Sequence, residues 1–304
     1  FMDGGRNVCG YSGYIHSFVC KVAEAYLFSG SGDEPLSDDE LTDLMKSLWN
    51  ADVNRAGAHD ITTNIQSKTD SDSSEDLAPK RLFTHVNEGH LFNRSTYAAF
   101  LKLLNNYDPN LDDGEHTTPE EESETTHFLN EISKTEVMQR TVHLLREKGY
   151  LSSWNELEAQ IREIWFTNFA RHARSHVRCS SGFEHVFVGE YTDTEVEGFH
   201  NWIEFYLQEK AGNLNYLGYL YVNQPNIIGV HFTWHGRLKK YNAIIYGTSP
   251  EFDLAMYTVC YFVRHNKKCS FELAGHPVVV HTFDIERDNS KHLGTAYVDA
   301  GNTN

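Results

Sequence analysis

The sequence predicts an α+β fold, in which a helical first part precedes a part built on antiparallel β-sheets with packed helices. Helix caps followed by apolar residues at helical spacing recur between residues 37 and 166. After about residue 170, alternating apolar and polar residues and tight-turn sequences become frequent. Hydrophobic residues make up 40% of the 304-residue chain, enough to form a core. We therefore divide the chain into an N-terminal helical region, 1–167, and a C-terminal region of antiparallel sheets, 168–304.

The helical region contains several segments that begin with a recognisable cap. Ser37 and Glu40 have the spacing of a capping box, and Thr118-Pro119 places a cap before a proline at the first helical position. The polar stretch 50–80 is expected to be a surface loop. The expected helices are 19–28, 37–49, 95–104, one starting at 118, 135–148 and 153–166.

The C-terminal region alternates short strands with two helices. Phe183, His185 and Phe187 alternate with their neighbours and predict a strand. His235-Gly236 is a candidate tight turn between two strands. The other expected strands are 217–222, 227–234, 237–245, 271–273, 278–283 and 295–298, and the expected helices are 201–210 and 250–264.

Charge is distributed unevenly along the chain. The formal net charge is −17, which by itself argues against a nucleic-acid partner. Residues 168–304, however, carry 12 Lys and Arg against 14 Asp and Glu, so almost all of the excess negative charge lies in residues 1–167. A polyanion could bind the C-terminal region, and such binding would be modest and sensitive to salt.

Cysteine usage and hydropathy leave the compartment open. The five cysteines do not form the pattern of a disulfide-rich framework, although Cys9 with Cys20 or Cys260 with Cys269 could pair in an oxidising compartment. No apolar run is long enough to cross a membrane, so no membrane association is expected. No signal peptide is recognisable in this chain, and secreted and intracellular locations are both compatible with it.

Two histidines and a basic segment stand out as candidate catalytic groups. His185 lies in the stretch Ser-Gly-Phe-Glu-His-Val-Phe, His200 lies just before the helix 201–210, and Arg-Leu-Lys-Lys follows at 237–240. A histidine between phenylalanines is more often a structural residue, and a histidine before a helix is often only a cap. Histidine nevertheless provides both an acid and a base near neutral pH, and lysine provides a fixed positive charge. RNA carries its own nucleophile, the 2′-hydroxyl, so these three groups would suffice to cleave it.

Five short segments, occurring in order, resemble the EndoU family of poly(U)-specific endoribonucleases (the XendoU-like proteins). They are Ser-Gly-Phe-Glu-His-Val-Phe (181–187), Gly-Phe-His-Asn-Trp (198–202), Tyr-Leu-Gln-Glu-Lys (206–210), Ser-Pro-Glu-Phe (249–252) and Thr-Ala-Tyr-Val (295–298). Upstream, residues 48–55 and 96–107 are similar to the helical region of the family. The resemblance covers nearly the whole chain and implies that residues 168–304 form the catalytic region.

The resemblance also implies specific roles for residues of this chain. The catalytic trio falls on His185, His200 and Lys239, with Lys240 as the alternative lysine; strand alternation lets only one of the two face the site. Uridine contacts fall on Thr295 and Tyr297. We take His200 as the general base and His185 as the general acid, although the two roles can be exchanged.

The implied activity is cleavage of single-stranded, U-rich RNA at uridylates, giving 2′,3′-cyclic phosphate ends with stimulation by Mn²⁺ or Ca²⁺. No metal site is assigned; Glu184 and Glu190, expected on the strand face opposite His185, could ligate a cation or pair with arginines. The protein is expected to be a monomer. The alternatives are an RNA-binding relative that does not cut and, with less support, a regulatory protein whose acidic helices sense calcium.

Overall fold

The structure is a computed structural model, and it describes residues 36–172, 175–288 and 290–300. The expected helix 19–28 and the pair Cys9 and Cys20 lie outside these residues. Within them the fold is mixed, with helices and antiparallel sheets, as the sequence predicts. Among the described residues, no helix has the length and apolar character needed to span a membrane.

The first part of the chain is mainly helical. Its longer helices begin where the sequence places caps: both expected capping boxes form, with Ser37 and Thr118 each accepting a hydrogen bond from the backbone of a glutamate three residues on. These elements are α2 (Asp38–Ala51), α3 (Glu88–Leu91), α4 (Ser95–Leu103), α5 (Pro119–Ser133), α6 (Glu136–Glu147), α7 (Trp154–Ile161) and a π-helical turn, η1 (Arg162–Phe166).

The interpretation of residues 50–80 as a loop was only partly right. One short strand, β1 (Ile61–Thr63), lies within this stretch and pairs antiparallel with β2 (Phe83–Val86), which follows it in the chain. Three residues of mixed polarity are too short a run to show a strand periodicity, which is why the pattern missed β1. The connecting segment also pairs with the sheet region, since Lys68 forms a parallel bridge with Tyr219.

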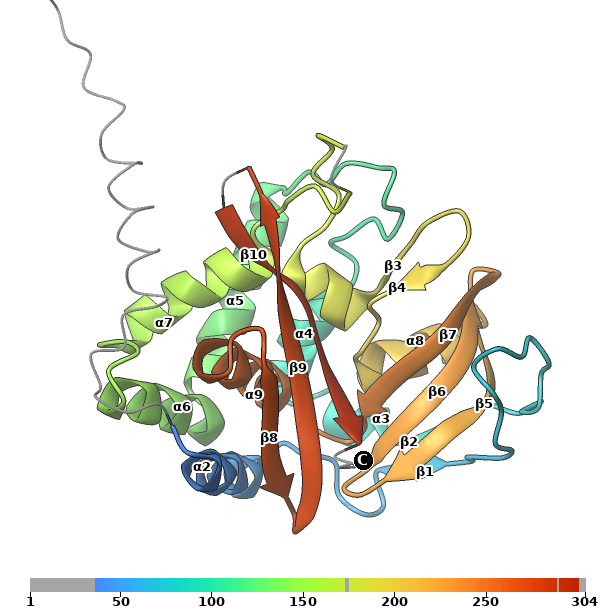
Figure 1. Cartoon of the computed structure of the whole chain (residues 1–304), viewed down its shortest axis with the longest axis horizontal. Helices are drawn as coiled ribbons and strands as arrows, with labels where there is room; N and C mark the ends of the chain where they lie inside the picture. Colours follow the sequence, from blue (N-terminus) through green and yellow to red (C-terminus); the bar gives the residue numbers. More distant parts are fainter. Residues whose placement is uncertain (1–35, 173–174, 289, 301–304) are drawn as a thin grey trace, which may run out of the picture.

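The second part contains two three-stranded antiparallel sheets. One sheet has the order β5-β6-β7, formed by β5 (Leu214–Asn223), β6 (Ile227–Trp234) and β7 (Arg237–Ile245). The other has the order β10-β9-β8, formed by β8 (Lys268–Leu273), β9 (His276–Arg287) and β10 (Ser290–Ala300). Two helices, α8 (Trp202–Ala211) and α9 (Pro250–Val263), and a two-stranded ribbon of β3 (Glu190–Tyr191) and β4 (Val196–Glu197) complete it. In Figure 1 the β8–β10 sheet runs through the middle of the molecule, between the N-terminal helices and the β5–β7 sheet.

The helical part packs against the sheets through one continuous cluster of buried apolar residues. Phe83 on β2 lies with its ring centroid 6.1 Å from Trp202, 6.0 Å from Phe205 and 6.1 Å from Tyr206, all on α8. The buried carboxylate of Glu209 accepts hydrogen bonds from the backbone of β2 and the residue before it. The small β1–β2 sheet is therefore fixed to the helix that follows His200.

A disulfide joins the end of α9 to β8. It links Cys260 and Cys269, which confirms one of the two pairings considered from the sequence. Cys179 is a buried free thiol.

Candidate active site

All five residues singled out from the sequence line a single cavity of about 360 Å³: His185, His200, Lys239, Thr295 and Tyr297. The cavity lies where β7, β10 and β4 meet the segments that carry the two histidines. Residues 195–198, Tyr241 and Ala243 complete its wall. Positions separated by up to 112 residues in the chain thus share one concave site.

The segment around His185 is helical, and the prediction of a strand was wrong. Residues 184–188 form a π-helical turn, η2 (Glu184–Val188), which begins after Ser181 accepts a hydrogen bond from the amide of Glu184. Phe183 and Phe187 are four residues apart, a helical spacing as much as a strand alternation, and their rings stack with centroids 4.9 Å apart. The helical turn places both phenylalanines in the core and His185 at the cavity.

The two histidines meet because their segments cross at close range. The amides of Phe199 and His200 donate to the carbonyls of His185 and Val186 at 2.8 and 2.7 Å. Gly198 has φ +59°, and a Cβ on it would lie 1.8 Å from the carbonyl oxygen of His185. Only glycine can occupy this position. The imidazole centroids of His185 and His200 lie 6.4 Å apart.

A buried carboxylate holds His185 in place. Nδ1 of His185 donates to Glu190 at 2.6 Å, and Glu190 also pairs with Arg171 at 3.3 Å and accepts from the hydroxyl of Ser180. Because Nδ1 is engaged, Nε2 is the nitrogen left for a substrate. The prediction that Glu190 faces away from His185 was wrong, because it rested on strand alternation. Sequence reasoning did not identify Arg171 or Ser180, which lie outside the family segments.

The other histidine and the lysine have different surroundings. Nδ1 of His200 donates to the carbonyl of Ala243 at 3.3 Å, and Asn201, the next residue, caps α8. Lys239 lines the cavity, whereas Lys240 is exposed and is absent from the cavity wall. The alternation of β7 thus separates the two lysines as expected.

Burial shifts the titration of all three groups toward their neutral forms. The pKa of His185 falls to about 4, mainly through burial and the nearby Arg171, while Glu190 acts in the opposite direction. Burial and the Lys239 ammonium lower the pKa of His200 well below its usual value. Burial lowers the pKa of Lys239 to about 8, against the raising effect of Glu197, Glu195 and Glu190.

Tyr297 and Thr295 lie on the same face of β10. The ring of Tyr297 packs nearly parallel to His200, with centroids 5.3 Å apart. Both residues are half-buried at the cavity edge.

Two groups of acidic side chains are candidates for holding a cation. Ligand atoms of His185, Glu190 and Glu197 lie within 4.8 Å of one another. Both oxygens of Glu190, however, already have partners, and Arg171 and Lys239 add positive charge at this position. This first group therefore fits a divalent cation poorly.

The second group is Asp52, Glu251 and Asp253, where α2 ends and α9 begins. All three side chains are buried, and each keeps one oxygen with no hydrogen-bond partner among the described residues. Burial raises the pKa of Asp52 to about 7, and the negative charge of Glu251 adds to the effect. Unpartnered carboxylate oxygens are the ligands that hard cations such as Ca²⁺ and Mn²⁺ prefer. Among the described residues, however, only His185, Glu190 and Glu197 bring three ligand atoms within 4.8 Å of one another, so the oxygens of this second group would have to move closer together to hold a cation.

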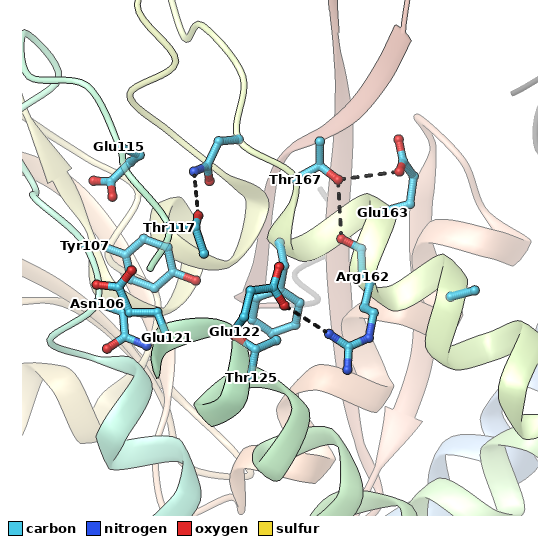
Figure 2. A pocket seen from close by; sticks show the side chains of 13 residues that line it. Asn106, Tyr107, Glu115, Thr117, Glu121, Glu122, Thr125, Arg162, Glu163 and Thr167 are labelled. Atoms are coloured by element: carbon cyan, nitrogen blue, oxygen red, sulfur yellow. Dashed lines mark hydrogen bonds and ion pairs between the residues drawn. The ribbon is translucent and has the colours of Figure 1, made fainter. Parts of the chain in front are cut away.

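A separate cavity of about 210 Å³ lies between α5 and η1. Figure 2 shows that glutamates surround it, with Arg162 on one side pairing with Glu122 at 3.7 Å. Burial and neighbouring carboxylates raise the pKa of Glu115, at its edge, to about 7. None of the five predicted site residues lines this cavity.

Comparisons with known proteins agree with the fold. The model of the family described as Endoribonuclease XendoU matches residues 40–298. The chain is 36% identical to the uridylate-specific endoribonuclease of Bos taurus, covering 96% of this chain and 69% of that protein. It is 37% identical to uridylate-specific endoribonuclease D of Xenopus laevis, covering 81% and 83%.

The solved structure described as "The structure of XendoU: a splicing independent snoRNA processing endoribonuclease" superposes with a TM-score of 0.73 at 32% identity. The match covers 86% of this chain and 97% of that structure. The fold and the matched sequence are therefore those of an endoribonuclease. The chain belongs to the XendoU family.

Proposed function

We propose that this protein cleaves single-stranded RNA after uridylates, using the substrate's 2′-hydroxyl as nucleophile and leaving 2′,3′-cyclic phosphate ends. The observation that carries the proposal is the meeting of His185, His200 and Lys239 in one cavity beside Thr295 and Tyr297. The relatives described as uridylate-specific endoribonucleases support the choice of substrate.

Environment supports the assignment of roles to the two histidines. The pKa of His200 is well below its usual value, so it is neutral in the free enzyme and suited to accept the 2′-hydroxyl proton. Glu190 favours the protonated form of His185 and His200 has no such carboxylate partner, so His185 is the better donor to the departing 5′-oxygen. Lys239 places an ammonium where charge accumulates on the phosphoryl oxygens.

In this proposal, Thr295 and Tyr297 on β10 recognise the uracil base. The Thr295 hydroxyl can both donate to and accept from the pyrimidine edge, and the exposed part of the Tyr297 ring can contact the base. The splayed-out base that this contact requires is available only in single-stranded RNA. We also propose that the protein acts as a monomer.

We further propose that Mn²⁺ or Ca²⁺ stimulates the enzyme from the buried carboxylates Asp52, Glu251 and Asp253. A cation there would neutralise charge where α2 and α9 meet. It would also affect Asn201, whose side chain donates to Asp253 at 3.4 Å and which directly follows His200. In this proposal the cation supports the position of His200, and the catalytic steps are carried out by His185, His200 and Lys239.

The test uses an oligonucleotide with a single uridylate and a copy with 2′-deoxyuridine at that position. We expect cleavage of the first only, with a cyclic phosphate on the 5′ product. Changing His185, His200 or Lys239 to alanine should each lower the rate about 100-fold or more, because each removes an acid, a base or a charge from the transition state.

Lys240→Ala is the matched control and should cleave at nearly the wild-type rate. Equal cutting of the two oligonucleotides would overturn the mechanism. Binding of RNA without cleavage in a single-turnover assay would instead favour the RNA-binding relative that does not cut.

A further inference from the structure

An aromatic surface extends from the active site along the β8–β10 sheet. The ring of Tyr297 lies nearly parallel to that of His281, with centroids 5.0 Å apart and an interplanar angle of 19°. His281 is followed by Phe283 at 6.2 Å and 11°, and Phe283 lies 6.5 Å from Tyr297. The three rings share one face because β10 and β9 pair Tyr297 with His281 and Thr295 with Phe283.

Phe283 is exposed to a degree that packing does not require. Its side chain is 43% exposed, and it is one of five large apolar residues with such exposure in the described part of the chain. Every other phenylalanine there is buried or half-buried. An exposed flat ring directly across the strand pair from Thr295 is placed to meet whatever continues from the uridine site.

A cation lies at the far side of the same surface. Lys268 on β8 is paired with His281, so both side chains project from the same face of the sheet. Lys268 is exposed. Burial lowers the pKa of His281, and the positive charge of Lys268 also lowers it. A base-stacking surface followed by a lysine is the combination that binds single-stranded nucleic acid.

We propose that His281 and Phe283 form a stacking subsite for the nucleobase next to the cleaved uridylate, and that Lys268 contacts the phosphate beyond it. This rests on the proposed function, because the uridine site defines where the neighbouring base lies. One ribose-phosphate unit can span the 6.5 Å between the rings of Tyr297 and Phe283. The subsite would be tolerant of sequence, because every base presents a flat face.

The test is a cycle that combines a protein change with a substrate change. The substrates are hexanucleotides with one uridylate, carrying either a normal base or an abasic unit on its 5′ or 3′ side, so that the number of phosphates stays constant. We expect loss of one neighbouring base to lower kcat/KM of the wild type about tenfold. The same loss should have little effect on Phe283→Ala, because that variant cannot use the base.

Phe283→Trp should restore the discrimination, because it restores the ring surface. Val222→Ala, a change at an apolar residue of β5 that is 45% exposed, should behave like the wild type. Lys268→Ala should weaken the salt dependence of RNA binding by about one phosphate contact, without affecting discrimination against the abasic unit.

The proposal is overturned if the abasic unit costs Phe283→Ala as much as it costs the wild type, or if neither neighbouring position matters to the wild type. If the wild type cleaves none of these substrates, the proposed function fails. The same protein variants and abasic substrates are then compared by their Kd, with 2′-deoxyuridine replacing the single uridylate. This measurement tests the stacking subsite without requiring cleavage.

Discussion

Two side chains of the same type acquire different chemistry from their neighbours in this cavity. Both histidines are buried, but His185 donates to the carboxylate of Glu190, whereas His200 donates to a neutral backbone carbonyl. A carboxylate stabilises an imidazolium far more than a carbonyl does. The acid and base assignments therefore depend on Glu190, which is fully buried and held by Arg171 and Ser180.

Loss of the Lys239 ammonium should make activity fall more steeply at alkaline pH. Its pKa is lowered to about 8, so the ammonium is present below that pH and is lost as the pH rises through it. Deprotonation of the acid His185, whose pKa is about 4, already lowers kcat/KM as the pH rises, and we expect the slope of log(kcat/KM) to steepen above about pH 8, since this parameter reports ionisations of the free enzyme. Lys239→Arg should lower activity but remove the additional steepening, because arginine stays charged. A steepening that persists at the same pH in the arginine variant would show that another group is responsible.

The sequence predicted five residues that share one cavity, but not the contacts that hold them in place. His185, His200, Thr295 and Tyr297 were predicted because they lie in segments that resemble a family, and Lys239 because of its spacing from one of these segments; the cavity contains all five. The roles of Glu190, Arg171 and Phe283 depend on how distant segments cross. No local pattern encodes such contacts, so they required the structure.

At the level of elements, predictions succeeded where local signals were strong. The capped helices α2 and α5, the helix α8 and the hairpin of β6 and β7 all formed close to the expected bounds. The strand prediction failed at η2 because the alternating pattern covered only five residues. Over so short a stretch, Phe183 and Phe187 also have the i, i+4 spacing of a helix. Tertiary packing of Phe183 and Phe187 decides between the two.

The junction of α2, α8 and α9 should respond to divalent cations. The pKa values of Asp52, Glu251 and Asp253 are raised, so their contribution to stability is full below about pH 4 and is lost as the pH rises through their folded-state pKa, about 7 for Asp52. A cation binds the charged form. At pH 8, Ca²⁺ or Mn²⁺ should therefore raise Tm by about 5 °C when the cation exceeds its Kd a hundredfold. The rise in Tm should be smaller at pH 5.5.

Thermal unfolding with and without EDTA measures this effect. Asp253→Asn should reduce the gain in Tm, while Asp112→Asn, at an exposed acidic residue, should preserve it. An equal gain in both variants would place the cation elsewhere, and the acidic cavity between α5 and η1 would be the next position to test.

Across the whole molecule, the helical part completes the core of the sheet part. Phe83 packs on α8, Thr42 of α2 accepts from the backbone of β8, and Trp165 of η1 donates to Thr258 of α9 at 2.9 Å. The buried apolar cluster includes residues from both parts without interruption. The sequence-based division at 167/168 marks a change of secondary structure and remains a prediction as a domain boundary.

This continuity predicts that residues 168–304 do not fold alone. Removing the first part would expose a set of large buried side chains, each worth about 1.5–3 kcal/mol, and a typical domain is stable by only about 5–15 kcal/mol. We expect the fragment to lack near-ultraviolet circular dichroism and a cooperative thermal transition, and co-expression with residues 36–167 to restore both. A fragment that melts cooperatively near the Tm of the whole chain would instead establish residues 168–304 as an independent domain. His185 and His200 would then owe their positions to the sheet part alone, and the proposed link from Asp52 to His200 would lose its physical basis.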